Sequence, residues 1–346
     1  MDPISVCHVN LAKGFRGGER QTELLIKHLA SYTEKQFLIC RPNSPLAEHL
    51  QDVENLHILY ARTRLSCQLK RINADIIQAH EAKAVHWAFI HHKLHGIPYV
   101  ITRRVPQVIK KSFLSSLCYR HASCLVGISS AISSYLKSLN TATVTTINSA
   151  LAHMTCNDQE TNRIRNEYQG KIIIGHIGAY VDRHKGQRVL IEAARILHDL
   201  RHDLVFLCLG AGKDENQLKE ESRDLPEIKW LGFHKNVGDY LKAFDLFVFP
   251  SRNEGLGSTL LDVLDFSIPV IASNVDGIPD IIKDGTTGLL IENGNGRMLS
   301  EKILQLLENP ELAKNLSENG HKFTEEFIPE KMAAKYSELY HKILGR

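Results

Sequence analysis

Residues 251–262, which read SRNEGLGSTLLD, combine residue types that could hold a sugar attached to a phosphate. An acidic residue, a Gly-x-Gly turn and the start of a helix follow one another closely there. The backbone N–H groups at a helix start are unpaired and carry a partial positive charge, so they favour a bound diphosphate. Glu254 could accept hydrogen bonds from sugar hydroxyls, and Asp262, about one turn into the helix, could reach a ribose.

Short apolar runs alternate with amphipathic stretches along the chain, which indicates βαβ units and parallel sheets covered on both faces. In the first half, the predicted strands span 4–10, 36–41, 56–60, 75–80, 98–103, 124–129 and 143–148, and the predicted helices span 18–30, 45–52, 64–72, 82–94 and 130–139. In the second half, the predicted strands span 171–179, 204–210, 228–232, 245–250, 269–273 and 288–291. The predicted helices there span 186–200, 215–224, 237–243, 258–266, 297–308 and 310–327, with a last one from 329 onward.

These elements predict an α/β protein of two Rossmann-like, doubly wound domains that face a cleft. Ligands should bind at the carboxyl ends of the strands that line it. The pattern weakens between residues 151 and 170, which we interpret as the interdomain linker. We therefore expect an N-terminal domain over 1–150 and a C-terminal domain over 171–328, with a final helix over 329–346.

The second half resembles the nucleotide-sugar domain of retaining GT-B glycosyltransferases of family 4. The resemblance lies in PSRNEGLG (residues 250–257), PVIA (269–272) and GIPDII (277–282), which keep the family's order and spacing. It implies that Glu254 binds the donor sugar and that a second acidic position, here Asp262, binds the ribose. It also implies that sugar and phosphate are cradled by the backbone amides of Gly255, Leu256, Gly257 and Ser258.

A second resemblance lies in GAYVDRHKG (residues 178–186), which is similar to the family's Gly-Arg-Leu-x-x-x-Lys-Gly segment. In the family, the arginine and the lysine hold the donor diphosphate. Lys185 occupies the lysine position, whereas Ala179 stands where the arginine is expected. Our hypothesis is that Arg183 supplies the missing charge, because fixed cations must stabilise a diphosphate that leaves without a metal.

Glycine-rich turns in both halves are also similar to donor-binding segments of the family. The run GFRGGE (residues 14–19) follows the first predicted strand, and Gly17, Gly18 and Arg16 would approach the donor phosphate. Gly210 lies in a turn where the family contacts the nucleotide. The alternative for each run is an ordinary turn or helix start.

On the acceptor side, His80 ends a predicted strand in a segment similar to a histidine motif of the family, with a packed core histidine as the alternative. Arg103 and Arg104 end the next strand, in a variant similar to bacterial lipopolysaccharide-core transferases. Arginine cannot act as a base, but an arginine pair suits a phosphorylated or carboxylated acceptor.

The charges of the chain are distributed unevenly. Residues 1–150 contain 18 Lys and Arg but 9 Asp and Glu, a net charge of +9, whereas the remainder carries −6. No acidic residue occurs between Glu81 and Asp158. This basic half predicts an anionic acceptor or an anionic membrane surface. Nucleic acid is not expected, since aromatic residues are not interleaved with the basic ones.

Basic and apolar residues adjoin one another at Lys110, Lys111, Phe113, Leu114 and Leu117. Together they could rest on an anionic leaflet, and inward packing of the apolar residues is the alternative. The apolar runs are too short to span a membrane, and the N-terminal residues lack the pattern of a signal peptide. The seven cysteines are scattered, which favours a reducing cytoplasm over a disulfide framework.

These features predict a retaining glycosyltransferase that moves a sugar from a nucleotide-diphosphate donor to a hydroxyl of a glycan or glycolipid. The resemblance implies that no metal is obligatory, in line with the absence of an Asp-x-Asp pair from the chain, and we expect no cofactor. Lipopolysaccharide core or another cell-surface glycan is the expected acceptor, and the expected location is the cytoplasm, with peripheral contact at the inner membrane. A sugar-nucleotide epimerase or hydrolase of the same fold, and a sugar-nucleotide-binding module without catalysis, are the alternatives.

Overall fold

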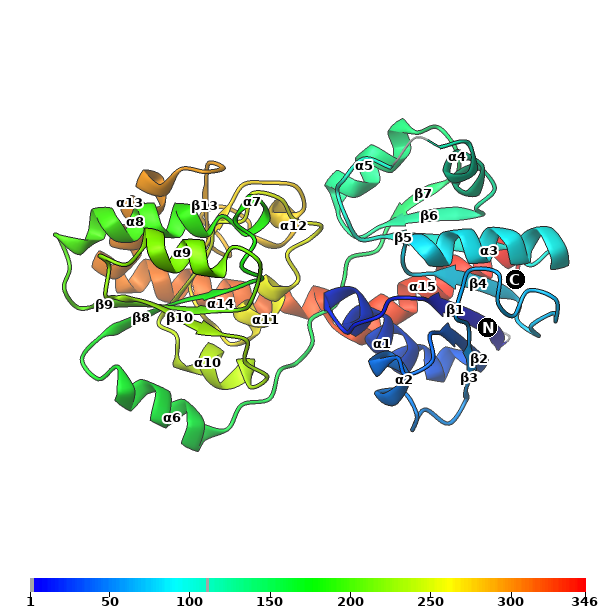
Figure 1. Cartoon of the computed structure of the whole chain (residues 1–346), viewed down its shortest axis with the longest axis horizontal. Helices are drawn as coiled ribbons and strands as arrows, with labels where there is room; N and C mark the ends of the chain where they lie inside the picture. The colour runs from blue at the N-terminus through cyan, green and yellow to red at the C-terminus, as the bar shows by residue number, and fades with distance from the viewer. Residues whose placement is uncertain (1–2, 110–111) are drawn as a thin grey trace. The chain divides into compact units, whose positions relative to one another are not determined.

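The computed structural model describes residues 3–109 and 112–346, and its elements form two compact α/β units (Figure 1). The first unit comprises Met1–Ala152 together with Phe327–Arg346, and the second comprises His153–Glu326. Each unit is built around one parallel sheet with helices on both faces. The predicted α/β class with two doubly wound units is confirmed.

In the described part of the first unit, seven strands form a parallel sheet in the order β3-β2-β1-β4-β5-β6-β7. Every residue of β1 is buried, as its continuous apolar run predicts. The strands are β1 (Ile4–Asn10), β2 (Thr33–Cys40), β3 (Leu56–Tyr60), β4 (Ile76–Ala79), β5 (Tyr99–Arg103), β6 (Cys124–Gly127) and β7 (Val144–Thr146).

The helices of the first unit include one from the far end of the chain. They are α1 (Gly17–Leu29), η1 (Ala30–Tyr32), α2 (Pro45–Glu48), α3 (Ala82–His95), α4 (Phe113–Arg120), α5 (Ser130–Ser138) and α15 (Pro329–Leu344). Helix α15 packs against α1 and buries Tyr336 and Tyr340 in the same apolar core as Ile4 and Leu25. The tyrosine hydroxyls are satisfied there, since Tyr340 Oη donates to Gln78 Oε1 at 2.9 Å.

The helix predicted over residues 64–72 is wrong, because the structure has turns in this segment. Cys67 adopts a φ of 62°, which a helix does not tolerate. Side-chain bonds hold the turns instead: Trp87 Nε1 donates to Ser66 O at 2.8 Å, and Gln68 Nε2 donates to Trp87 O at 3.2 Å. Long-range contacts with α3 therefore override the helical pattern of the local sequence.

In the second unit, six described strands form a parallel sheet in the order β10-β9-β8-β11-β12-β13. The strands are β8 (Ile172–Ile177), β9 (Leu204–Leu209), β10 (Ile228–Gly232), β11 (Leu246–Phe249), β12 (Val270–Ser273) and β13 (Leu289–Ile291). The helices are α6 (Asp158–Glu167), α7 (Asp182–Lys185), α8 (Gln187–His198), α9 (Glu215–Glu221), α10 (Val237–Ala243), α11 (Thr259–Asp265), α12 (Ile278–Ile281), α13 (Gly296–Glu308) and α14 (Pro310–Thr324), followed by η2 (Glu325–Phe327).

The strand order reverses between β1 and β4 in the first unit, and between β8 and β11 in the second. In doubly wound sheets, ligands bind outside the carboxyl ends of the strands at such reversal points. The loops that follow these four strands are therefore where binding groups are expected. They contain His80 in the first unit, and Lys185 and Glu254 in the second.

Candidate functional site

Two loops of the second unit bring Lys185 and Glu254 into direct contact. Lys185 ends α7, which follows β8, and Glu254 lies in the loop after the neighbouring strand β11. Lys185 Nζ donates to Glu254 Oε1, and Ser251 Oγ donates to the same oxygen at 2.9 Å. The Lys185 ammonium also lies 5.3 Å from the centre of the Phe249 ring. A cation and a hydrogen-bond acceptor thus share one position at the carboxyl edge of the sheet.

Backbone contacts fix these two loops to each other. The carbonyl of His184 accepts hydrogen bonds from Arg252 N at 2.8 Å and from Asn253 N at 3.2 Å. Gly186 has a φ of 66°, and a Cβ atom there would lie 1.9 Å from Pro250 O. Only glycine allows this approach. In the Lys-Gly pair, Gly186 is therefore required for packing, and Lys185 supplies the charge.

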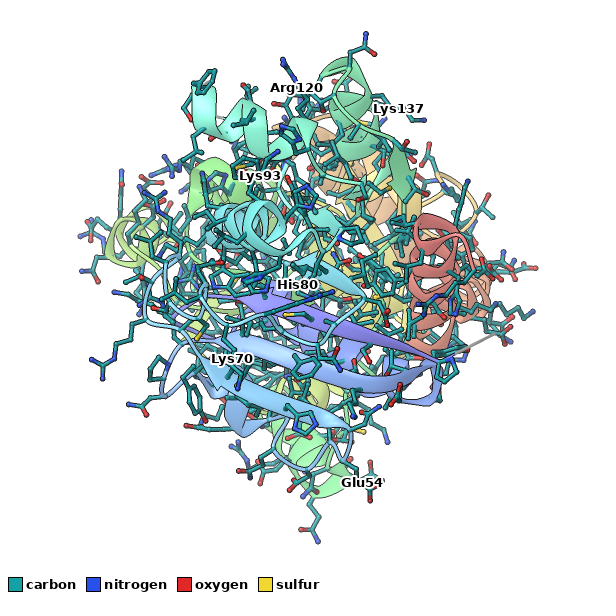
Figure 2. The ribbon with its side chains drawn as sticks, turned by 90° about the vertical axis from the view of Figure 1, so that its right-hand side faces the viewer. Glu54, Lys70, His80, Lys93, Arg120 and Lys137 are labelled. Carbon is teal, nitrogen blue, oxygen red and sulfur yellow. The ribbon has the colours of Figure 1, made fainter. Side chains whose placement is uncertain are left out.

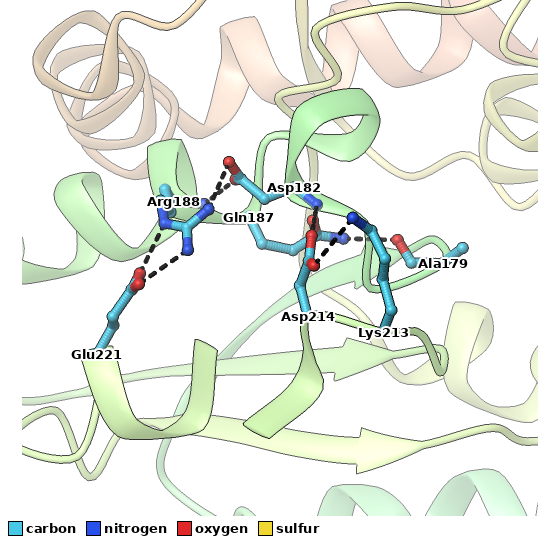
Figure 3. A network of polar contacts seen from close by, with 7 residues as sticks. All are labelled: Ala179, Asp182, Gln187, Arg188, Lys213, Asp214 and Glu221. Atoms are coloured by element: carbon cyan, nitrogen blue, oxygen red, sulfur yellow. Dashed lines mark hydrogen bonds and ion pairs between the residues drawn. The ribbon is translucent and has the colours of Figure 1, made fainter. Parts of the chain in front are cut away.

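A polar network holds the lysine loop from the other side (Figure 3). The Arg188 side chain donates to Asp182 Oδ2 at 3.0 Å and, with two nitrogens, to the Glu221 carboxylate at 2.8 Å each. Asp182 Oδ1 also accepts from the Arg188 backbone N–H at 2.8 Å, and Asp214 Oδ2 accepts from Asp182 N at 2.9 Å. The hydrogen bonds to Glu221 and Asp182 raise the pKa of Arg188, so the network stays charged.

His176, which is buried near Lys185, is neutral. The Nδ1 atom of His176 is 3.1 Å from Val248 O, and its Nε2 atom is 3.4 Å from Gln187 Nε2. Gln187 Nε2 also donates to Ala179 O at 3.0 Å (Figure 3). Burial lowers the pKa of His176 to about 4, so the ring adds no charge near Lys185.

The turn after Glu254 is anchored by a carboxylate. Asp276 Oδ2 accepts hydrogen bonds from Glu254 N at 2.8 Å and from Asn253 Nδ2 at 3.0 Å. Gly257 has a φ of 80°, which favours glycine. Within the described ranges, the backbone N–H groups from Gly255 to Ser258 donate to no protein acceptor. Their hydrogen-bonding capacity is available, as the proposed phosphate cradle requires.

The other predicted donor-side residues of the second unit are Arg183, Asp262 and Gly210. Arg183 is exposed, and its Nε contacts His184 Nε2 at 3.1 Å. Asp262 is buried in α11. Gly210 packs on the Gly178 carbonyl, where a Cβ atom would lie 1.9 Å from the oxygen. Gly210 is therefore required for packing against Gly178, which the glycine pattern of the sequence did not show.

In the first unit, the predicted Arg16, Gly17 and Gly18 form the start of α1. Arg16 and Gly17 are exposed, and Arg16 N donates to Glu19 Oε2 at 3.0 Å. A Cβ atom on Gly18 would lie 3.6 Å from Arg104 Cδ. His80 is buried and contacts His8, whose Nδ1 atom lies 3.0 Å from His80 Nε2.

The two adjacent arginines do not form a pair. Arg103 Nη1 donates to Tyr119 Oη at 3.3 Å, Arg103 Nη2 donates to Gln107 O, and the guanidinium lies over the Tyr135 ring. Arg104 instead donates to Ser149 Oγ at 3.4 Å. Successive side chains at a strand end point to opposite faces, which explains the divergence.

The basic part of the first unit also exposes apolar residues. Figure 2 shows Lys93, Arg120 and Lys137, which come from α3, α4 and α5. Phe113 is 85% exposed and Leu114 is 40% exposed, so inward packing does not account for them. Lys110 and Lys111, predicted to adjoin them, lie outside the described residues.

Sequence reasoning missed the residues that support the site. Asp276, Asp182, Arg188 and His176 were not predicted, although they hold the two loops of the Lys185–Glu254 pair. A signal existed for Asp276, which precedes glycine and has a φ of 47°. Asp182 and Arg188 also contact each other, but all three residues depend on partners 32 or more positions away, so no local pattern reveals their role.

With this geometry in place, the class of fold can be stated. The structure superposes with a TM-score of 0.83 on a crystal structure of HepE from Anabaena in complex with UDP-glucose. The match covers 98% of this chain and 100% of that chain at 16% identity. The fold is therefore GT-B, with two Rossmann-like α/β units.

Residues 157–323 match the family model described as Glycosyl transferases group 1. Over 171 residues, the chain is 34% identical to an uncharacterised glycosyltransferase of Methanocaldococcus jannaschii, a match that covers 48% of this chain and 47% of the relative. It is 25% identical over 191 residues to a capsular polysaccharide biosynthesis glycosyltransferase of Staphylococcus aureus, covering 51% and 50%. The chain thus spans about half the length of the curated relatives it matches.

None of the helices in the ranges 3–109 and 112–346 has the length and apolar character needed to cross a bilayer. The same ranges contain no group of three or more His, Cys, Asp or Glu side chains that could hold a metal ion.

Proposed function

We propose that the chain is a retaining glycosyltransferase that uses a nucleotide-diphosphate sugar. The observation that carries this proposal is the Lys185–Glu254 contact at the carboxyl ends of β8 and β11. A diphosphate needs a fixed cation, and a sugar needs a hydrogen-bond acceptor for its hydroxyls. Both groups occur here in the unit that matches the group 1 family model.

Each residue would then have a defined role. Lys185 binds the donor diphosphate, with Arg183 as the proposed second cation, and stabilises the negative charge that develops as the nucleotide diphosphate leaves. Glu254 binds the sugar hydroxyls. The amides from Gly255 to Ser258 cradle sugar and phosphate, Asp262 lies on the ribose side, and Gly210 approaches the nucleotide through its backbone.

The proposed reaction retains the anomeric configuration. The acceptor oxygen attacks the anomeric carbon from the face that the diphosphate leaves, and the carbon–oxygen bond to the phosphate breaks. The hydroxyl proton passes to the departing phosphate oxygen, so no protein base is required. Proton NMR of the product would show the donor's anomeric configuration, and an inverted product would contradict this mechanism.

The acceptor we propose is a cell-surface glycan or glycolipid, with lipopolysaccharide core as the leading candidate. One relative is a capsular polysaccharide biosynthesis glycosyltransferase, which supports a surface glycan. The acid-free segment 82–157, with exposed Lys93, Arg120 and Lys137, supports an anionic acceptor and peripheral contact with the cytoplasmic face of the inner membrane. Sedimentation with anionic and neutral liposomes tests this contact, and equal partitioning would remove it.

Donor binding is the decisive experiment. Thermal melting of the full chain with uridine, guanosine and adenosine diphosphate sugars at millimolar concentration should reveal one donor that raises Tm, because a ligand stabilises the state that binds it. The Lys185→Ala variant should lose that shift when its Tm with donor is compared with its own ligand-free Tm. A chain that responds to no donor, or a K185A variant that responds like the wild type, would contradict the proposal.

The reaction is also proposed to need no metal. Transfer measured with the identified donor should keep its rate in EDTA and should not rise with added Mg²⁺ or Mn²⁺. A rate that collapses in EDTA and recovers with either ion would show that a cation assists the diphosphate.

A further inference from the structure

Arg104 is a cation without an ion-pair partner, at the carboxyl end of β5 in the first unit. Its Nη1 atom makes one long hydrogen bond, 3.4 Å to Ser149 Oγ, and its Nε atom is buried without a partner. No carboxylate within the described ranges lies at ion-pair distance from it. Glu19 acts on it only from farther away, and the Glu19 carboxylate accepts from Arg16 N. Burial lowers the pKa of Arg104, which is the expected effect on an unpaired cation.

The neighbouring arginine provides the contrast. Arg103 is satisfied by Tyr119 Oη, by Gln107 O and by the face of the Tyr135 ring. Its side chain therefore has a structural role in holding α4 and α5. Arg104 is half-buried and its Nε atom lacks a hydrogen-bond partner, so a bound anion would supply the acceptor that the protein does not.

A chain of hydrogen bonds fixes the proton on His80. Gln36 Nε2 donates to Ile26 O at 3.0 Å, so the Gln36 oxygen must face His8 Nε2, which lies 3.1 Å away and carries a proton. His8 Nδ1 is then an acceptor, and the atom 3.0 Å from it, His80 Nε2, must be the donor. Burial lowers the pKa of His8 to about 4, in agreement with a neutral ring.

The second nitrogen of His80 consequently carries a lone pair. His80 is 3% exposed, and its Nδ1 atom has no hydrogen-bond partner. Burial, His8 and Arg104 together lower the pKa of His80 well below its usual value. The atom can therefore accept a hydrogen bond but does not donate one.

Contacts with α1 position the Arg104 side chain. Arg104 Cδ lies 3.6 Å from the Cβ position of Gly18, and the Arg104 charge acts on His80. Gln21 of α1 donates to Ala150 O at 2.6 Å and accepts from Ala150 N at 2.8 Å, which holds the adjoining Ser149 beside Arg104. Ala79 lies opposite Ile101 in the register of β4 and β5, so His80 and Arg104 follow the ends of neighbouring strands. A cation and a lone pair therefore occur at the same edge of the sheet.

We propose that Arg104 and His80 form a binding site for an acidic group that adjoins a hydroxyl. Arg104 binds the phosphate or carboxylate, and His80 Nδ1 accepts a hydrogen bond from the hydroxyl. The inference rests on the proposed function in assigning this group to the acceptor, and it leaves Arg103 outside the site. The acceptor would then be a hydroxylated acid such as a phosphorylated sugar or a hydroxycarboxylate.

Two probes separate the acid from the hydroxyl: glycerol 3-phosphate has both, and methyl phosphate has the acid alone. In NMR titrations of the full chain, glycerol 3-phosphate should bind several-fold more tightly than methyl phosphate. Arg104→Gln should weaken both at least tenfold, whereas Arg103→Gln should change neither by more than twofold. His80→Phe should reduce glycerol 3-phosphate binding to the level of methyl phosphate.

Folding is checked by thermal melting. Removing the unpaired cation should leave the Tm of R104Q equal to or above the wild-type value, whereas R103Q should lower Tm because Tyr119 and Gln107 lose their partner. Absence of binding by the wild type, or equal losses in R103Q and R104Q, would overturn the proposal.

A phosphate at Arg104 could instead belong to the donor, and titration with UDP, GDP and ADP distinguishes the two sources. Affinity for the nucleoside diphosphate that binds should be unchanged in R104Q and lost in K185A. If R104Q loses nucleotide affinity but keeps glycerol 3-phosphate affinity, the acceptor assignment is overturned. Failure of every nucleotide to bind would contradict the proposed function and leave the glycerol 3-phosphate result standing.

Discussion

At the scale of single residues, Lys185 and Glu254 depend on each other. The Lys185 side chain is 23% exposed and the Glu254 side chain is 11% exposed, so each charge is largely removed from water and compensated by the other. If the diphosphate of a donor pairs with the Lys185 ammonium, the Glu254 carboxylate loses its cation and needs another hydrogen-bond donor. In the proposed function the sugar hydroxyls would meet that need, which would couple recognition of the phosphate to recognition of the sugar.

A double-mutant cycle tests this coupling. Lys185→Met should destabilise the chain by roughly 1–3 kcal/mol, because it leaves a largely buried carboxylate without its cation. The Lys185→Met/Glu254→Gln double variant should lose less than the sum of the single variants, with an interaction energy of roughly 0.5–3 kcal/mol in urea unfolding. Additive losses of unfolding free energy would show that the Lys185–Glu254 contact does not contribute to stability. The exposed Arg183 is the control, and Arg183→Ala should stay within about 0.5 kcal/mol.

The sequence predicted the groups of the site better than their supports. Glu254 and Lys185 lie in short motifs that can be identified in a single sequence. The structure brings the two side chains into contact. Arg103 and Arg104 also looked equivalent, because a sequence does not show which side chain finds a partner in α4 or α5. That difference depends on Tyr119 and Tyr135, which lie 16 and more residues away.

At the scale of elements, the lysine loop depends on one close backbone approach. Gly186 joins α7 to α8 with a left-handed backbone and contacts the carbonyl of Pro250 at the end of β11. The sequence predicted a helix from residue 186 and a strand ending at residue 250, but it did not show that they touch. The same contrast explains the missing helix over 64–72, where contacts with α3 decide the structure.

Substitution of Gly186 measures the weight of this contact. Gly186→Ala combines a left-handed backbone with a clash against Pro250 O, so it should cost about 2 kcal/mol or more. Gly285 is the matched control, since its φ is 71° and a Cβ atom there meets nothing within 4 Å. Gly285→Ala should cost only the backbone strain, about 1 kcal/mol. Equal shifts in the midpoint of urea unfolding would show that the Pro250 contact contributes nothing.

At the scale of the whole molecule, both units contain buried neutral histidines. Burial lowers the pKa of His8 and His91 in the first unit, and of His176 in the second, to about 4 in each case. An unfolded chain has histidine pKa values of about 6.5 and so binds more protons between pH 6.5 and 4. Stability should be complete above pH 6.5 and fall toward pH 4, by up to about 1.4 kcal/mol per pH unit for each histidine.

The two tryptophans allow this loss to be followed in each unit. Trp87 stacks on His91 in the first unit, with ring centres 4.7 Å apart, and Trp230 contacts Tyr180 in the second. Trp230→Phe therefore reports the first unit by fluorescence, and Trp87→Phe reports the second. Urea midpoints should fall between pH 7 and pH 5 in both variants, more in the first unit, which contains more of these histidines. A midpoint that is constant down to pH 5 would contradict the neutral assignments.

Helix α15 lies after the second unit in the chain but packs in the core of the first, where Tyr336 meets Thr102 at 2.8 Å. During synthesis on the ribosome, residues 1–152 emerge long before this helix exists. The core of the first unit lacks Tyr336 and Tyr340 until α15 has been made, whereas the second unit contains no residue later than Glu326. Nascent chains should therefore acquire protease resistance in reverse order of translation, and chaperones should bind the earlier-made half.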